Sequence, residues 1–130
     1  KVLDNPPVYL DAAHNPQGIS VIRPALENTV VLFAIASDKD AAAMAALLEE
    51  GPAEVIVTAF RGSRAMPAPQ LARHFNRPLR AVIPAISEAL PHALELARQQ
   101  GCRLVVLGSI YAIAEARTML ADADSSAGQP

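Results

Sequence analysis

Short, almost entirely apolar runs alternate with alanine- and leucine-rich runs along the whole sequence, and this alternation constrains the fold more than any other feature. Runs such as VVLFAIA, VIVTAF and LVVL lack the polar alternation of strands that expose one face to water. They are typical of parallel strands covered by helices on both sides. We therefore predict an α/β fold, a three-layer sandwich with a mostly parallel sheet of five to six strands and helices on both faces. The expected strands are residues 8–11, 29–36, 54–60, 80–83 and 103–107.

The helical runs between these strands have recognisable start and stop residues. Asp40 is suited to cap a helix that Gly51 ends, and Gly101 is suited to end the helix before the last strand. Pro24 interrupts the run that follows Pro16, so we expect a short or broken helix there. The pattern thus predicts a helix between each strand and the next, as parallel pairing requires.

The length of the chain fits one domain. A chain of 130 residues with 52% hydrophobic residues can build one core and leaves little room for two. We assign this domain to residues 1–121, with its last helix over residues 111–121. Residues 122–130 lack large apolar side chains, which predicts a disordered tail. The first residue is Lys1 rather than Met, as in a segment cut from a larger protein.

Charge and cysteine content exclude several classes of function. Eleven Lys and Arg against thirteen Asp and Glu give a net charge of −2, which argues against a surface built to bind nucleic acid or an anionic membrane. The single cysteine, Cys102, excludes an internal disulfide and a Cys₄ zinc site. No apolar run approaches the roughly 20 residues that span a bilayer. We expect a cytoplasmic protein with neither nucleic acid nor a membrane as partner.

Several catalytic motifs are missing. The sequence has no GxxxxGK[ST] phosphate loop and no GxGxxG fingerprint, so it is neither a complete P-loop enzyme nor an ordinary dinucleotide-binding domain. Its three histidines lack the spacing of a metal site, and we expect no metal ligands in this chain. Doubly wound sheets bind ligands beyond the carboxyl ends of their strands, so the polar residues there are the candidates for function.

The first expected strand is followed by a dense group of polar residues. Asp11, His14 and Asn15 place a carboxylate, an imidazole and an amide directly before Pro16. Asn15 is also a plausible N-cap, with Pro16 at the first helical position. Two interpretations have equal support: a ligand-binding loop, or a capped turn in which the carboxylate accepts hydrogen bonds from backbone amides.

The second and the last strand also end in polar residues. Lys39 between two acidic residues, one of them Asp40, could orient a ribose or a phosphate, although an N-cap with a solvated ion pair is the favoured alternative. After the last strand, Gly108 permits close approach of the backbone, and Ser109 and Tyr111 lie where a helix begins. A tight turn from strand to helix explains that segment equally well.

Residues 61–80 contain five arginines and no acidic residue, the one locally basic stretch of the chain. Arg73 and Arg77 fall at a helix end, where a solvated positive charge is favourable in any case. Arg61 and Arg64 fall in the loop after the third strand, on the side where ligands are expected. These two are therefore the better candidates for binding an anionic substrate.

The segments LDAAHNP and SDKD, the loop with Arg64 and the turn GSIY follow one another in an order that resembles one family closely. They look like the C-terminal domain of folylpolyglutamate synthase/dihydrofolate synthase, within the Mur ligase superfamily. The resemblance covers residues 7–120 and implies a Rossmann-like fold. It also implies an ATP-dependent amide ligase, which activates a substrate carboxylate as an acyl phosphate for attack by the amine of L-glutamate. The acceptor would be dihydropteroate or a folate (poly)glutamate.

The resemblance also implies roles for individual residues. ATP would be bound by Asp11, His14 and Asn15, with His14 also catalytic. The glutamate or substrate would be bound by Lys39, Asp40, Arg64, Ser109 and Tyr111. ATP and Mg²⁺ would be held mainly by an N-terminal P-loop domain that this sequence lacks. The chain alone should therefore be inactive, and the family suggests a monomer.

Two other interpretations stay open. The chain could be the C-terminal domain of another Mur-type amino-acid ligase, one that acts on a cell-wall precursor. It could also be a non-catalytic α/β domain that binds a small ligand at the same strand ends. The second interpretation predicts that Asp11→Ala leaves any ligase activity of the parent chain intact.

Overall fold

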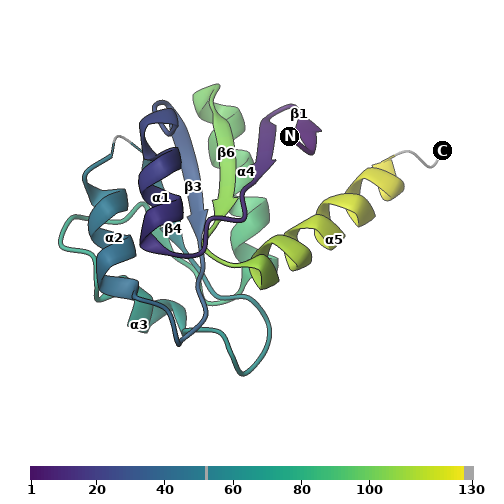
Figure 1. Ribbon diagram of the computed structural model, residues 1–130. Helices are drawn as coiled ribbons and strands as arrows, with labels where there is room; N and C mark the ends of the chain where they lie inside the picture. Colours follow the sequence, from purple (N-terminus) through teal and green to yellow (C-terminus); the bar gives the residue numbers. More distant parts are fainter. Residues whose placement is uncertain (52, 128–130) are drawn as a thin grey trace.

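The computed structural model describes residues 1–51 and 53–127 (Figure 1). Six strands form one sheet in the order β1-β2-β6-β3-β4-β5, and every neighbouring pair is parallel except β1 and β2. The predicted α/β fold with a mostly parallel sheet is confirmed. The strands are β1 (Leu3–Asp4), β2 (Pro7–Leu10), β3 (Thr29–Phe33), β4 (Glu54–Val57), β5 (Ala81–Val82) and β6 (Arg103–Leu107).

Helices cover both faces of the sheet, as Figure 1 shows for α1 and α2 on one face and for α4 on the other. The helices are α1 (Pro16–Ile22), the 3₁₀ turn η1 (Arg23–Ala25), α2 (Ala41–Glu49), α3 (Ala68–Ala72), α4 (Ile86–Gln100) and α5 (Ile110–Ala127). None of the helices in the described part of the chain is both long and apolar enough to cross a membrane.

The central strand β3 explains why the sheet needs a helix layer on each side. All five of its residues are buried. Val30 and Leu32 belong to the core that α4 and α5 close, whereas Val31 and Phe33 belong to the core that α1, α2 and α3 close. Successive residues of a strand point to opposite faces, so an unbroken apolar run fills two cores at once.

The predicted start and stop signals of the helices are confirmed. The side chain of Asp40 caps α2, and Gly101 ends α4 in the left-handed conformation with φ of 65°. Pro24 follows the end of α1 and lies in the 3₁₀ turn η1, so the first helix is short, as expected.

Three strands, β3, β4 and β5, are shorter than predicted, although buried residues follow the ends of β3 and β4. Residues 34–36 are buried like β3. The Ala34 N–H still donates to the Leu107 oxygen of β6, but residues 35 and 36 contact a loop instead of a strand. The Met66 N–H, for example, donates to the Ile35 oxygen, and Ala36 forms an isolated bridge with Ala65. A continuous apolar run indicates that its residues are buried, not that they pair with a neighbouring strand. The strand predicted from the run was therefore too long. The antiparallel strand β1, with two residues, was not predicted.

The last helix is longer than predicted. We expected it to end at residue 121, whereas α5 continues to Ala127. The disorder predicted for the tail is not seen over residues 122–127, which are helical, and residues 128–130 lie outside the described part of the chain. No glycine or proline occurs between Ala121 and Ala127, and alanine favours the helix, so the local sequence offers no stop signal.

Candidate functional site

A hollow of about 540 Å³ opens at the carboxyl ends of the parallel strands, as expected for this topology. Loops that follow β2, β3, β4 and β6 all contribute to its wall. Five of the eight residues that the sequence singled out line this hollow. They are His14, Lys39, Arg64, Ser109 and Tyr111.

Gly108 sets the shape of the hollow at the end of β6. Its φ is 110°, a conformation that side-chain-bearing residues rarely adopt. A Cβ at this position would lie 2.3 Å from the Ala34 oxygen and 3.0 Å from the ring of Phe33. The Gly108 N–H donates to the Ala13 oxygen at 2.8 Å, which ties the end of β6 to the loop after β2. Any side chain at this point would therefore strain the turn into α5.

Ser109 and Tyr111 form the start of α5 at the wall of the hollow. The Tyr111 N–H donates to the Ser109 Oγ at 3.1 Å, and Ser109 is buried. The hydroxyl of Ser109 thus satisfies a backbone donor of the first turn of the helix. The Tyr111 ring stacks on Phe60, with centroids 5.3 Å apart and an interplanar angle of 28°.

Arg64 lies against Tyr111, which comes from a distant part of the chain. Arg64 Nη1 donates to the Tyr111 hydroxyl oxygen at 3.0 Å, and the guanidinium carbon lies 5.9 Å from the centroid of the same ring. The Arg64 oxygen accepts hydrogen bonds from the Ser37 N–H at 2.8 Å and the Ser37 hydroxyl at 3.2 Å. The arginine predicted from the basic stretch is therefore fixed at both its backbone and its head, with further N–H groups of the guanidinium left for an anion.

Lys39 and its neighbour Asp40 have different surroundings. Lys39 lines the hollow, and its ammonium forms no hydrogen bond or ion pair with residues 1–51 or 53–127. Asp40 does not line the hollow; its Oδ1 accepts the Ala43 N–H at 3.1 Å and caps α2. The alternative favoured from the sequence, an N-cap, describes Asp40, while Lys39 is available to a ligand.

His14 lines the hollow from the loop after β2. Its Nδ1 lies 2.9 Å from the Ala12 oxygen. A carbonyl oxygen can only accept, so Nδ1 carries the proton of this bond. In the neutral imidazole the other ring nitrogen, Nε2, is then an acceptor.

Asp11 and Asn15 do not line the hollow. The Asp11 Oδ1 accepts the Ala13 N–H at 2.9 Å, and Asp11 borders a separate groove beneath α1. The Asn15 Oδ1 accepts the Gly18 N–H at 2.8 Å and caps α1. Both side chains thus form the capped turn that was the alternative to a ligand-binding loop, and their role in ATP binding stays a prediction.

Two further residues at the hollow were missed in the sequence. Ser63 lies beside Arg64 in the same loop, where its position next to a candidate arginine was an available signal. Ile110 lies between Ser109 and Tyr111 with 59% of its side chain exposed. Its exposure could not be inferred from the sequence, because an apolar residue at the start of a helix is usually buried.

The hollow has a positive balance of charge. Lys39 and Arg64 face one carboxylate, that of Asp38. The carboxylates and phosphates of small metabolites fit such a lining. Within the described ranges, 1–51 and 53–127, no group of three His, Cys, Asp or Glu side chains is arranged to hold a metal ion. The residues of this chain therefore fit an anion and do not by themselves fit a metal.

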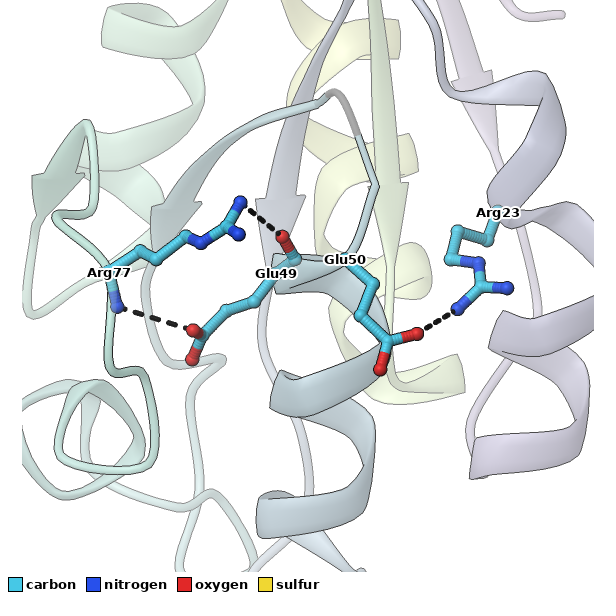
Figure 2. Close-up of polar contacts among 4 residues, drawn as sticks. All are labelled: Arg23, Glu49, Glu50 and Arg77. Carbon is cyan, nitrogen blue, oxygen red and sulfur yellow. Dashed lines mark hydrogen bonds and ion pairs between the residues drawn. The ribbon is translucent and has the colours of Figure 1, made fainter.

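A second hollow, of about 330 Å³, lies at the opposite end of the sheet, where β4 and β5 begin. Three of its four charged side chains are bonded to the protein: Glu54 accepts from Gln100 Nε2 at 3.0 Å, and Figure 2 shows the bonds of Glu49 and Arg77. The fourth, Arg80, is exposed. The Glu49 carboxylate accepts the N–H groups of Asn76 at 2.6 Å and Arg77 at 3.2 Å. Arg77 Nη1 donates to the Glu49 oxygen at 3.1 Å, and Glu50 pairs with Arg23 at 2.6 Å. These side chains fasten loops to one another.

Comparison with known proteins agrees with this geometry. The family described as Mur ligase, glutamate ligase domain, matches residues 1–110. No curated protein sequence matches the chain.

Solved structures of complete ligases contain the same fold. Folylpolyglutamate synthase of Mycobacterium tuberculosis, complexed with ADP and AMPPCP, is 26% identical with a TM-score of 0.80, over 91% of this chain and 30% of that chain. The bifunctional folylpolyglutamate synthase/dihydrofolate synthase of Yersinia pestis, complexed with AMPPNP and a Mn ion, is 28% identical with a TM-score of 0.80, over 93% and 30% of the two chains. A bifunctional synthase with Mn, AMPPNP and L-glutamate bound is 27% identical with a TM-score of 0.78, over 93% and 30%.

The chain thus spans about 30% of the length of the solved structures that it matches. The match to the family, in contrast, extends over most of this chain and includes the loops that follow β2, β3 and β4. By this match the chain belongs to the Mur ligase, glutamate ligase domain family.

Proposed function

We propose that this chain is the C-terminal domain of an ATP-dependent amide ligase that adds L-glutamate to dihydropteroate or to a folate (poly)glutamate. The observation that carries the proposal is the positively charged hollow at the carboxyl ends of the strands, in a chain of this family. The similar synthases bind adenine nucleotides, and one of them binds L-glutamate as well. A carboxylate-bearing amino acid and a phosphorylated acid suit the same cationic lining.

The reaction has two steps. The substrate carboxylate takes the γ-phosphoryl group of ATP and becomes an acyl phosphate, with ADP as the leaving group. The glutamate amine then attacks the acyl carbon, loses a proton, and displaces phosphate as the amide bond forms. Both steps develop negative charge on phosphoryl and carbonyl oxygens, so cationic groups held in place before the reaction lower the barrier.

Residues at the hollow can perform specific parts of this chemistry. Lys39 has no partner among the described residues and is free to bind a carboxylate or a phosphate. Arg64 is held by Tyr111 and can offer its other N–H groups to the same anion. His14, with its proton on Nδ1, has Nε2 available to accept the proton that the glutamate amine releases.

A second domain is part of the proposal. This chain has no phosphate loop, and the described residues contain no metal cluster, so the nucleotide phosphates and their Mg²⁺ would be held mainly by an N-terminal P-loop domain. Closure of the two domains would exclude water from the acyl phosphate. We expect the complete enzyme to be monomeric and cytoplasmic, and this chain alone to be inactive.

The test is ATP-dependent incorporation of labelled L-glutamate by the longer protein, a P-loop domain followed by this chain. Dihydropteroate and a reduced folate serve as acceptors. We expect incorporation by the wild type and a loss of at least tenfold in Arg64→Ala, since charged hydrogen bonds contribute about 1.5–3 kcal/mol. Arg80→Ala is the matched control, because Arg80 is an exposed arginine at the opposite end of the sheet.

Three results would contradict the proposal. A folded wild type that uses neither acceptor would exclude folate chemistry, and incorporation with a cell-wall precursor would then identify another Mur-type ligase. Full activity in Arg64→Ala would show that the hollow is not the site. Specific binding of a small ligand without any incorporation would favour the non-catalytic alternative.

A further inference from the structure

The loop that carries Arg64 is held at three places, and only two of them belong to the hollow. We call residues 61–64 the arginine loop. Its last carbonyl accepts two hydrogen bonds from Ser37, and the Arg64 head bonds to the Tyr111 hydroxyl. The third contact fastens the start of the loop, where the Arg61 N–H donates to Glu115 Oε1 at 2.7 Å.

Glu115 lies on α5, four residues after Tyr111. Residues four apart share one face of a helix, so the same face of α5 contacts both the start and the end of the arginine loop. Glu115 is partly buried and does not line the hollow. Its carboxylate can therefore influence a ligand only through the loop that it holds.

The middle of the loop has one further hydrogen bond, in which the Ala65 N–H donates to the Gly62 oxygen at 3.3 Å. Gly62 has φ of 123°, and no atom lies within 4 Å of the position that a Cβ would take there. Ser63 and Arg64 are exposed. A loop with a glycine and open space around it has many accessible conformations, so hydrogen bonds at its ends decide where it lies.

We infer that Glu115 is a positioning residue that sets where Arg64 lies in the hollow. A charge-assisted bond from a carboxylate to a backbone N–H is among the stronger hydrogen bonds, and the length of 2.7 Å fits that class. Without it, the Arg61 N–H bonds to water and the loop samples other conformations. Ligand affinity then falls in proportion to the fraction of molecules with Arg64 in place. The structural part of this inference stands alone, and its consequence for a ligand rests on the proposed function.

The structural part is tested without ligand by NMR on this chain. In Glu115→Ala we expect faster hydrogen exchange of the Arg61 amide and weaker nuclear Overhauser contacts between Arg64 and Tyr111. Glu115→Gln keeps a side-chain oxygen acceptor and should retain both signals. Glu88→Ala removes an exposed glutamate of α4 and serves as the control. Unchanged exchange and contacts in a folded Glu115→Ala would overturn the inference.

The consequence for a ligand is tested by titrating L-glutamate into the same variants and into Arg64→Ala. We expect Glu115→Ala to weaken binding about three- to tenfold, Glu115→Gln to rescue it, and the double variant to bind no more weakly than Arg64→Ala alone. Additive losses would overturn the inference, because Glu115 would then act on something other than Arg64. A wild type that does not bind L-glutamate contradicts the proposed function, and the exchange experiment then decides the inference.

Discussion

Charged side chains gather at both ends of the parallel sheet, yet their surroundings differ. At the amino end, Glu49 accepts two backbone N–H groups and Arg77 returns a bond to the carbonyl of Glu49 (Figure 2). At the carboxyl end, Lys39 has no side-chain partner in the described part of the chain, and Arg64 has one. At the amino end Glu49 and Arg77 hold loops together, whereas at the carboxyl end Lys39 and Arg64 have donors left for a ligand.

The difference arises from how each end is built. The carboxyl end is shaped by backbone, with Gly108 turned close to Ala34 and bonded to Ala13. Short side chains such as Ser109 and Asp40 accept the remaining backbone N–H groups there, so the Lys39 ammonium is not needed to hold the loops. At the amino end, the loop between α3 and β5 presents the N–H groups of Asn76 and Arg77, and the carboxylate of Glu49 accepts both. The same residue types therefore have different roles at the two ends. The role depends on whether the backbone N–H and C=O groups nearby already have hydrogen-bond partners.

The largest effect that we expect comes from the backbone at the carboxyl end. Gly108→Ala forces a side chain into positive φ and places its Cβ 2.3 Å from the Ala34 oxygen. Strained backbone and overpacking each cost about 1–3 kcal/mol, so the free energy of unfolding should fall by about 3 kcal/mol or more. Urea denaturation measures this change.

Gly62→Ala is the matched control, since its φ of 123° is similar but nothing lies within 4 Å of the new Cβ. Only backbone strain applies there, so the loss should be about 1–2 kcal/mol. Equal losses in the two variants would show that the close approach to Ala34 does not shape the carboxyl end.

The layers of the fold could be predicted because apolar runs report burial on both faces. The residues of β3 alternate between two cores, which the run VVLFAIA already implies. Strand ends could not be predicted from the same signal, because residues 35 and 36 stay buried after pairing with neighbouring strands stops. The strand β1 has two residues, which is too short for any periodic pattern.

The loops that form the site could be predicted, but the direction of each side chain could not. Topology brings the carboxyl ends of parallel strands together, and this places Lys39 and Tyr111 at one hollow. Asp11 is in the same loop as His14, and Asp40 is in the same loop as Lys39, yet each carboxylate accepts a nearby backbone N–H. Short acidic side chains can cap their own loop or bind a ligand, and only the loop conformation decides between the two.

The second-largest effect that we expect concerns ligand binding at the two ends of the sheet. On titration of this chain with L-glutamate, we expect NMR signals of Lys39, Ser109 and Tyr111 to move while those around Glu49 stay in place. Charged hydrogen bonds contribute about 1.5–3 kcal/mol, so Lys39→Ala should weaken binding about tenfold or more. Arg80→Ala should leave the affinity unchanged. Signal changes centred on residues around Glu49 would show that L-glutamate binds at the amino end instead.

The third effect separates two adjacent glutamates at the amino end. Glu49→Ala leaves two backbone N–H groups without their acceptor and should lower the free energy of unfolding by about 1 kcal/mol. Glu50→Ala removes only an exposed ion pair with Arg23, which contributes about 0–1 kcal/mol and should be the smaller loss. Urea denaturation at low and high salt distinguishes them, because salt screens the ion pair. A larger loss in Glu50→Ala would contradict the importance of the backbone bonds.

The smallest effect is a pH dependence from Cys102, which is buried directly before β6. Burial raises the pKa of the Cys102 thiol above its ordinary value, since the charged thiolate is disfavoured there. As pH rises past the ordinary thiol value of about 8.5, the unfolded chain releases the proton while the folded chain keeps it. The folded chain then binds more protons, so stability falls with rising pH and continues to fall until the folded thiol also ionises. Urea denaturation between pH 7 and 10 should show this fall in the wild type beyond that of Cys102→Ala. Parallel curves would mean that the thiol ionises equally in both states, and a slope of opposite sign would indicate a thiolate stabilised as in a reactive site.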